Sequence, residues 1–358
     1  MAPSGSGGII LMYPLIRSLL FRLDAETSHE LALRLLSAAC RIPLLVKPPR
    51  PAPAGKYPDQ SVEAMGIRFP NPVGLAAGLD KHGTARDAFR RMGFGFVELG
   101  TVTPRRQDGN PKPRLFRLAE HRALINRMGF NSVGLEQFKK NLEASRGNIV
   151  TGINIGKNAT TPVTDAIHDY LECLRGVYAL ADYIAINISS PNTESLRRLQ
   201  DHDMLDALLE ALDRERRQLA DRTGVRKPLI VKIAPDLDTR QIDAIAASMR
   251  AHSIDGVIAT NTTVSRPGVE NHPFAGEAGG LSGAPLRESS TRVVRMLHDN
   301  LQDEIPIIGV GGILDGEAAL EKLEAGARLI QLYTGLIYSG PALVGRILKE
   351  LEKVRPAT

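Results

Sequence analysis

The chain has little of several residue types whose abundance would identify other classes of protein. Its 358 residues include two cysteines, no tryptophan and only 4% aromatic residues. Cys40 and Cys173 cannot build a disulfide framework, and no histidines stand near them at ligand spacing, so we expect a reducing compartment and no bound metal. No apolar run reaches the ~18 to 20 residues that a membrane-spanning helix needs.

The charge balance and the missing nucleotide motif exclude further classes. Forty-five Lys and Arg residues against 40 Asp and Glu give a net charge of +5, a mild excess that favours small anionic ligands or an anionic membrane surface. No basic run is interleaved with aromatic residues, so we expect no nucleic acid partner. No GxGxxG motif follows a predicted strand and opens a helix, which argues against a Rossmann dinucleotide site.

Short apolar runs recur from residue 73 onward between longer stretches of helical periodicity. Such alternation predicts βαβ units and a parallel sheet covered on both faces. Eight units over about 265 residues match a closed α/β barrel of the (β/α)8 or TIM type; an open doubly wound sheet is the alternative. The predicted strands span residues 73–79, 96–102, 149–155, 183–188, 229–234, 256–262, 306–312 and 329–335.

Residues 11–47 carry a different pattern, ahead of the barrel at 73–358. Leu15 and Leu19 share one helical face near arginines, and Thr27-x-x-Glu30 is typical of a capping box that opens a second helix. The pattern predicts a small N-terminal amphipathic hairpin that either caps the barrel or rests on anionic lipid. We expect residues 1–10 to be a disordered leader. Residues 48–72 are predicted to be a linker and barrel-bottom segment, stiffened by prolines from 43 to 53.

Polar side chains cluster where the fourth predicted strand ends. Asn187, Ser189, Ser190 and Asn192 follow an apolar run, around the rigid Pro191. A Ser- and Asn-rich turn is the simpler explanation, but barrel active sites lie at these strand ends. Two long insertions, 104–132 and 263–286, follow the second and sixth strands and are predicted to cover the site.

Other strand ends indicate the ligand. Small residues at 76–78 allow a flat ring to approach the backbone, and glycine-rich turns at 279–283 and 309–312 suit a phosphate. Lys232 interrupts an apolar strand and needs an anionic partner if it is buried. Together these features favour flavin mononucleotide, FMN, with Lys232 near its pyrimidine ring. The alternative is a barrel aldolase or isomerase that uses Lys232 as a Schiff-base nucleophile.

Ten motifs in order resemble the class 2 dihydroorotate dehydrogenases, which are quinone-dependent and membrane-associated. The resemblance runs from about residue 12 to residue 350. The motifs are AAGLDK at 76–81, ELGTVTP at 98–104, KPRLFR at 112–117, INRMGFN at 125–131, GINIGKN at 152–158, NISSPNT at 187–193, VKIAPDL at 231–237, IATNTT at 258–263, GGLSG at 279–283 and IIGVGGI at 307–313.

The resemblance implies oxidation of (S)-dihydroorotate to orotate in pyrimidine biosynthesis, with one FMN per chain and a membrane quinone as terminal acceptor. Ser190 matches the catalytic base, which removes the C5 proton while hydride leaves C6. Matches to substrate-binding residues are Lys81, Asn126, Arg127, Met128, Gly129, Phe130, Asn187, Asn192, Asn261 and Thr262. Matches to flavin-binding residues are Ala77, Gly78, Leu79, Asp80, Lys81, Thr101, Asn154, Asn187, Lys232, Thr260, Gly283, Gly312, Tyr333 and Thr334.

The same resemblance separates the two classes of the family. Class 1 relatives carry cysteine where this chain has Ser190 and lack the hairpin, so both features imply quinone as the acceptor. His29, Arg117 and Tyr333 resemble residues of the family's quinone tunnel. The implied location is peripheral, on the cytoplasmic face of a bacterial inner membrane.

Overall fold

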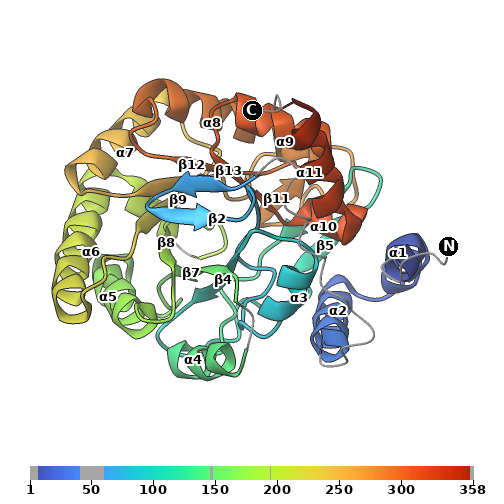
Figure 1. The fold of residues 1–358 in the computed structure, drawn as a ribbon, viewed down its shortest axis with the longest axis horizontal. Helices are drawn as coiled ribbons and strands as arrows, with labels where there is room; N and C mark the ends of the chain where they lie inside the picture. Colours follow the sequence, from blue (N-terminus) through green and yellow to red (C-terminus); the bar gives the residue numbers. More distant parts are fainter. Residues whose placement is uncertain (1–6, 41–59, 146–147, 194, 355–358) are drawn as a thin grey trace.

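The computed structural model describes residues 7–40, 60–145, 148–193 and 195–354. Eight parallel strands close into a barrel, and helices surround it (Figure 1). The predicted (β/α)8 barrel is confirmed, and the open-sheet alternative is wrong. Around the ring the strands are β3 (Val73–Leu75), β4 (Phe96–Val102), β7 (Val150–Ile155), β8 (Tyr183–Asn187), β9 (Leu229–Ile233), β10 (Gly256–Ala259), β12 (Ile307–Val310) and β13 (Leu329–Leu332).

Each predicted run contains one barrel strand, but several strands end earlier than expected. The first run was expected to reach residue 79, yet its ladder pairing ends at Leu75. Gly78 then adopts a φ of 91°, a left-handed conformation that glycine takes without a Cβ penalty. Polar residues at the ends of several runs, such as Ser190 and Asn261, therefore lie on loops just past the strands, whereas Thr101, Asn154 and Asn187 lie in the strands themselves.

The outer helices bury one apolar face against the strands. In α6, Leu205, Leu208, Leu209 and Leu212 are fully buried at helical spacing, as the sequence predicts. The helices of the barrel are α3 (Arg86–Arg91), α4 (Leu135–Ala144), α5 (Ala166–Val177), α6 (His202–Thr223), α7 (Thr239–Ala251), α8 (Arg287–Leu301), α9 (Gly316–Glu324), α10 (Thr334–Ser339) and α11 (Ala342–Val354).

A two-stranded antiparallel sheet closes the N-terminal end of the barrel. It consists of β1 (Val62–Ala64) and β2 (Ile67–Phe69), and the Phe69 ring lies 5.1 Å from the Phe96 ring inside the barrel. A Cβ on Gly74 would lie 2.2 Å from Phe96, so the bare backbone makes room for the ring. Residues 60–72 lie in the range where the sequence predicts a barrel-bottom segment; the proline-rich linker before them lies outside the described residues.

The two long insertions meet in a small sheet that the sequence did not predict. The first insertion contributes β5 (Leu115–Leu118) and β6 (Ala123–Asn126), and the second contributes β11 (Gly280–Gly283). β6 is the central strand and pairs antiparallel with both neighbours. Because the partners in the β6–β11 pair are more than 150 residues apart, no local pattern in either insertion reveals that pairing.

Helices α1 (Gly7–Leu20) and α2 (Ala25–Cys40) form the predicted hairpin, which lies beside α3 outside the ring of helices (Figure 1). α1 begins at Gly7, so the expected disordered leader of residues 1–10 overlaps the first residues of this helix.

The expected capping box at Thr27 and Glu30 is wrong. Asp24 caps α2, because its Oδ1 accepts from the backbone N–H groups of Glu26 and Thr27 at 3.0 Å. Within the part of the chain that the structure describes, no helix is long and apolar enough to cross a membrane.

Candidate active site

A cavity of about 1010 Å³ opens at the C-terminal ends of the barrel strands. The β5–β6–β11 sheet borders it through Asn126, Ser282 and Gly283. The predicted site residues that line it are Ala77, Gly78, Lys81, Thr101, Asn126, Met128, Gly129, Phe130, Asn187, Ser190, Asn192, Lys232, Thr260, Asn261, Thr262, Gly283, Gly312, Tyr333 and Thr334. Residues far apart in the sequence thus converge on one pocket.

Lys232 reaches the floor of this cavity and has the anionic partner that its burial requires. Its Nζ lies 3.5 Å from Oε1 of Glu98, a fully buried residue on β4. Asn154 Nδ2 donates to Glu98 Oε1 at 2.8 Å, and Gln331 Nε2 donates to Glu98 Oε2 at 2.7 Å. Tyr183 OH lies 3.4 Å from Oε2. The carboxylate is therefore surrounded by donors, as a buried charge must be.

Sequence reasoning missed Glu98 and Gln331, although a signal was present. Glu98 is a lone acid in the apolar strand Phe96–Val102, as unusual there as Lys232 is in its own strand.

A layer of amides lies above Glu98. Thr101 Oγ1 donates to Asn154 Oδ1 at 2.5 Å, and Asn187 Nδ2 lies 3.1 Å from both of those oxygens. Asn154 is fully buried and does not line the cavity, in contrast to its predicted contact with the flavin. It orients Thr101 and Asn187, which do line it.

The loop after β8 forms one wall. Asn192 Nδ2 donates to Asn126 Oδ1 at 3.1 Å, and the Asn192 backbone N–H donates to Ser190 Oγ at 3.2 Å. Asn261 Nδ2 donates to Ser189 Oγ at 3.1 Å. Within the described ranges of the chain, three buried oxygens nearby have no hydrogen-bond partner, namely Asn131 Oδ1, Asn192 Oδ1 and Thr193 Oγ1. Unpaired buried polar atoms are costly, so this wall is suited to a polar ligand with donors of its own.

Lys81 supplies a cation between this wall and the hairpin. Burial lowers its pKa to about 8, although Glu26 on α2 raises it. Its predicted neighbours Leu79 and Asp80 do not line the cavity. Asp80 instead accepts from the backbone N–H groups of Thr84 and Ala85, at 3.0 and 2.8 Å, and so fixes the loop that carries Lys81.

Glycines open the opposite side of the cavity. Gly283, Gly311 and Gly312 have φ values of 98°, 119° and 72°. A Cβ on Gly312 would lie 2.3 Å from Cα of Arg287, at the start of α8. Only glycine fits there, and the bare backbone N–H groups suit a phosphate, as predicted.

Of the three predicted quinone residues, His29 on α2 and Arg117 on β5 do not line the cavity, whereas Tyr333 does. Its hydroxyl donates to Gly78 O at 3.3 Å. The His29 side chain is hydrogen-bonded to the backbone of Leu79 in the adjacent loop, and burial, followed by the charge of Lys81, lowers its pKa to about 3. Arg117 donates to Leu20 O at 3.3 Å and stacks 4.7 Å from the Phe21 ring, so it holds α1.

Arg127 does not line the cavity, although it was predicted to bind substrate. Its guanidinium pairs with Glu277 of the second insertion and lies 4.7 Å from the Phe116 ring. It therefore ties the two insertions together behind the wall.

Comparison with known proteins agrees with this geometry. The family model for dihydroorotate dehydrogenase matches residues 60–354. The chain is 59% identical to the dihydroorotate dehydrogenase (quinone) of Chromobacterium violaceum, over 94% of this chain and 96% of the relative. It is 56% identical to the Burkholderia thailandensis enzyme of the same name, over 96% and 98% of the two chains.

A solved structure is similar as well. The crystal structure of the Eimeria tenella DHODH in complex with ferulenol has a TM-score of 0.83 and 39% identity, over 92% of this chain and 90% of that one. These relatives are dehydrogenases, so the aldolase alternative is not supported. The chain belongs to the dihydroorotate dehydrogenase family, as a quinone-dependent flavoenzyme that oxidises dihydroorotate to orotate in pyrimidine biosynthesis.

Proposed function

We propose that the flavin of this enzyme is FMN and that it occupies the cavity between the β3 loop and the glycine turns. The support is the donor set. Gly283, Gly311 and Gly312 offer bare N–H groups to a single phosphate, and Lys232 supplies a cation at the barrel floor. Gln331 lines the same cavity, and its buried Oε1 has no hydrogen-bond partner among the residues that the structure describes. When bound, FMN supplies the acceptor for the hydride that leaves the substrate.

Two measurements test this cofactor assignment. Flavin released by heat from the purified protein should co-migrate with FMN and not with FAD. Gly312→Ala should release its flavin, because the new methyl group would overlap Arg287 and force the backbone out of its left-handed conformation. FAD in the wild type, or full flavin content in the variant, would contradict the assignment.

We propose Ser190 as the catalytic base and the surrounding amides as the substrate site. Ser190 lines the cavity with Asn126, Asn187 and Asn192 on the same side. An alcohol is a weak base, so the proton must pass onward as the transition state forms. Thr193 Oγ1 and Asn131 Oδ1 are both buried and find no hydrogen-bond partner in the described part of the chain, so they are candidates for this relay. Lys81 would pair with the substrate carboxylate.

Substitution of the base tests the assignment directly. Ser190→Ala should slow anaerobic flavin reduction by dihydroorotate by at least ~10²-fold, the usual scale for losing a general base, while the flavin stays bound. Ser248→Ala is the matched control, because Ser248 is a buried serine on α7 that does not line the cavity, and its effect should be far smaller. If Ser190→Ala reduces its flavin at the wild-type rate, another group is the base.

We propose further that the hairpin guides a membrane quinone to the flavin and rests on anionic lipid. Quinone-dependent relatives are membrane-associated in general. In this chain Leu15 and Leu19 of α1 and Leu35 of α2 are 66%, 63% and 59% exposed, although each is a large apolar side chain. Arg34 beside them is also exposed. Exposed leucines flanked by arginines suit an interfacial helix pair, and the location follows as the cytoplasmic face of a bacterial inner membrane.

Removal of the hairpin tests this division of labour. Deletion of residues 1–47 should abolish quinone turnover and leave flavin reduction by dihydroorotate intact. Quinone turnover that survives the deletion would make the hairpin a structural element only.

A further inference from the structure

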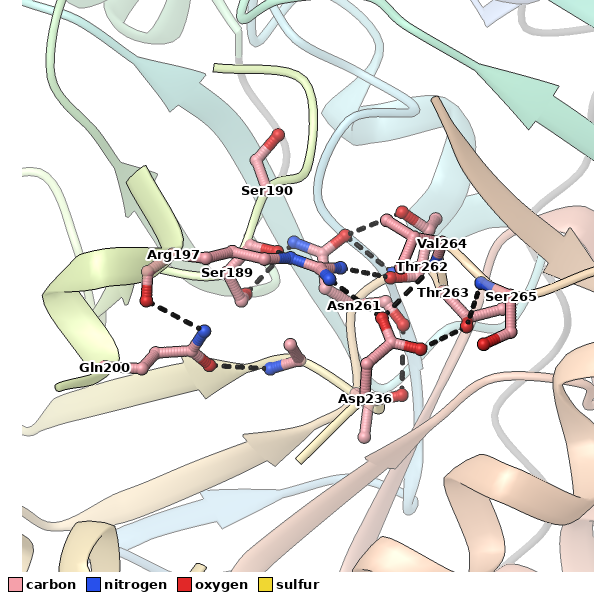
Figure 2. A network of polar contacts seen from close by, with 12 residues as sticks. Ser189, Ser190, Arg197, Gln200, Asp236, Asn261, Thr262, Thr263, Val264 and Ser265 are labelled. Carbon is pink, nitrogen blue, oxygen red and sulfur yellow. Dashed lines mark hydrogen bonds and ion pairs between the residues drawn. The ribbon is translucent and has the colours of Figure 1, made fainter. Parts of the chain in front are cut away.

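One arginine outside the cavity links three strand ends around the proposed base. Arg197 lies on the 3-10 turn η2 (Leu196–Gln200) and donates from all three guanidinium nitrogens (Figure 2). Nε donates to Ser189 O at 3.1 Å, after β8, and Nη2 donates to Thr262 O at 2.9 Å, after β10. Nη1 donates to Asp236 Oδ2 at 2.8 Å, after β9.

Asp236 secures the same region from the other side. Its Oδ1 accepts from Thr263 Oγ1, and its Oδ2 accepts from the backbone N–H of Val264 at 3.2 Å. Thr263 is almost fully buried, so the carboxylate is bound to an ordered part of the β10 loop. Arg197 and Asp236 together form what we call the clamp.

Gln200 anchors the turn that carries the clamp. Its Oε1 accepts from the backbone N–H of Ala234 at 3.0 Å, just after β9, and its Nε2 donates to Arg197 O at 3.4 Å. The backbone of Arg197 is therefore attached to the barrel independently of its side chain. A substitution of the Arg197 side chain leaves this attachment in place.

The carbonyl that Arg197 holds determines where Ser190 lies. Ser189 O belongs to the peptide unit that joins Ser189 to Ser190, and this unit is planar. A donor on that oxygen fixes the orientation of the plane from which Ser190 projects. Figure 2 shows Ser190 on the far side of the chain from the clamp. The second carbonyl belongs to Thr262, which lines the cavity with Asn261.

We propose that Arg197, oriented by Asp236, is a positioning residue that sets Ser190 against the residues holding the substrate. The proposal rests on the role of Ser190 proposed above. Neither clamp residue lines the cavity, so neither is a catalytic residue. Three diverging hydrogen bonds require a planar guanidinium, and the single ammonium group of lysine cannot reproduce that fork.

The primary test compares two arginine variants of the FMN-loaded enzyme. Arg197→Met should slow anaerobic flavin reduction at saturating dihydroorotate by roughly 10- to 100-fold, since small misplacements of reacting groups carry losses of this size. Reoxidation by quinone should be unchanged. Arg175→Met is the control: Arg175 makes two hydrogen bonds to Glu215, at 2.9 and 2.6 Å, between the outer helices α5 and α6. It should reduce its flavin at the wild-type rate.

A double variant distinguishes positioning from general structural damage. If Arg197 acts through Ser190, then Arg197→Met should cost much less in a Ser190→Ala background than in the wild type. Losses that multiply in full would overturn the proposal. Orotate-induced changes in the flavin absorbance spectrum provide a second readout. Arg197→Met should still show these changes, but the dissociation constant for orotate should be larger than in the wild type.

Two further variants keep the proposal open to refutation if Arg197→Met does not retain its flavin. Asp236→Asn keeps the size of the side chain but removes its charge, and Arg197→Lys keeps the charge but removes the fork. Both should reduce their flavin more slowly than the wild type, and wild-type rates in both would overturn the clamp. If Ser190→Ala reduces its flavin slowly and Arg197→Met reduces its flavin at the wild-type rate, the clamp proposal alone is overturned. If Ser190→Ala itself reduces its flavin at the wild-type rate, the role of Ser190 as the base is overturned.

Discussion

The barrel and the hairpin each contain a buried pair of opposite charges, in very different surroundings. Glu98 and Lys232 lie inside the barrel, where their side chains are 0% and 6% exposed. Glu26 of α2 and Arg114 of the first insertion join the hairpin to the barrel, at 6% and 7% exposure. The first pair lies in the barrel interior, at the floor of the cavity. The second lies where α2 meets the first insertion.

The two pairs differ in how much apolar packing surrounds them. The barrel around Glu98 is lined by residues such as Ile230, Ile258 and Ile308, all fully buried. The hairpin exposes leucines on its outer side, and on its inner side only partly buried apolar residues such as Leu33 and Leu36 pack against the barrel core. Polar contacts add to this packing: Tyr13 OH donates to Ile337 O, and Arg17 Nη1 donates to Tyr338 O, both at 2.6 Å. A region with few fully buried apolar contacts opens more readily than an apolar core.

The largest effect is expected inside the barrel. Glu98→Gln leaves Lys232 buried without its anion, so the free energy of unfolding should fall by about 3 to 5 kcal/mol. Urea unfolding of the flavin-free protein, followed by far-ultraviolet circular dichroism, measures it, because bound FMN would add its own stabilisation. The double variant Glu98→Gln/Lys232→Met should recover much of the loss, since no unpaired charge remains. A double variant less stable than Glu98→Gln would show that the pair is not the source of the loss.

Glu98 also shows how far the sequence predicts this molecule. The periodicity of the strands predicts the barrel, and Lys232 in an apolar strand requires an anionic partner. Periodicity alone could not identify that partner as Glu98, because the distance between the two residues depends on how the strands pair in the closed ring. Asn154 was expected to contact the flavin because it is an amide near the C-terminal end of a barrel strand. Only the structure shows that its amide donates to Glu98 instead. The β6–β11 pairing and the Arg197 contacts depend on loops that have no periodic pattern.

A smaller, local effect is expected at the hairpin junction. Glu26→Gln removes the carboxylate that accepts from Arg114 Nη2 at 2.7 Å, and hydrogen bonds between charged groups contribute about 1.5 to 3 kcal/mol. Amide hydrogen exchange should accelerate in α1 and α2 and stay unchanged in the barrel strands. Equal acceleration in both regions would mean that the hairpin and barrel unfold as one unit.

Acidification should loosen the same junction. The pKa of His29 is about 3 in the docked hairpin, against an ordinary value near 6.5, because burial and then the charge of Lys81 disfavour its cation. A detached hairpin therefore binds a proton more readily, and the contribution of His29 to docking is complete above about pH 6.5 and is lost as the pH falls toward about 3. Exchange in α2, corrected for intrinsic rates, should rise between about pH 7.5 and about pH 5.5.

The variant His29→Asn controls for this pH effect. It should lose the change between those two pH values, because asparagine does not titrate. Glu26 acts in the same direction only at lower pH, since burial is outweighed by Arg114 and Lys112, which lower its pKa below the ordinary value. A persistent pH dependence in His29→Asn would assign the effect to another group.

The smallest effect on stability is expected from the outer face of the hairpin. The double variant Leu15→Gln/Leu19→Gln changes side chains that are 66% and 63% exposed, so the free energy of unfolding should move by no more than about 0.5 kcal/mol per site. Binding to anionic vesicles should nevertheless fall, because these side chains would be buried only in lipid. Val225→Gln, at a site 50% exposed on the barrel, is the matched control and should bind vesicles like the wild type. If the leucine variant binds vesicles as well as the wild type does, these two side chains do not contact lipid, and the membrane contact lies elsewhere on the molecule.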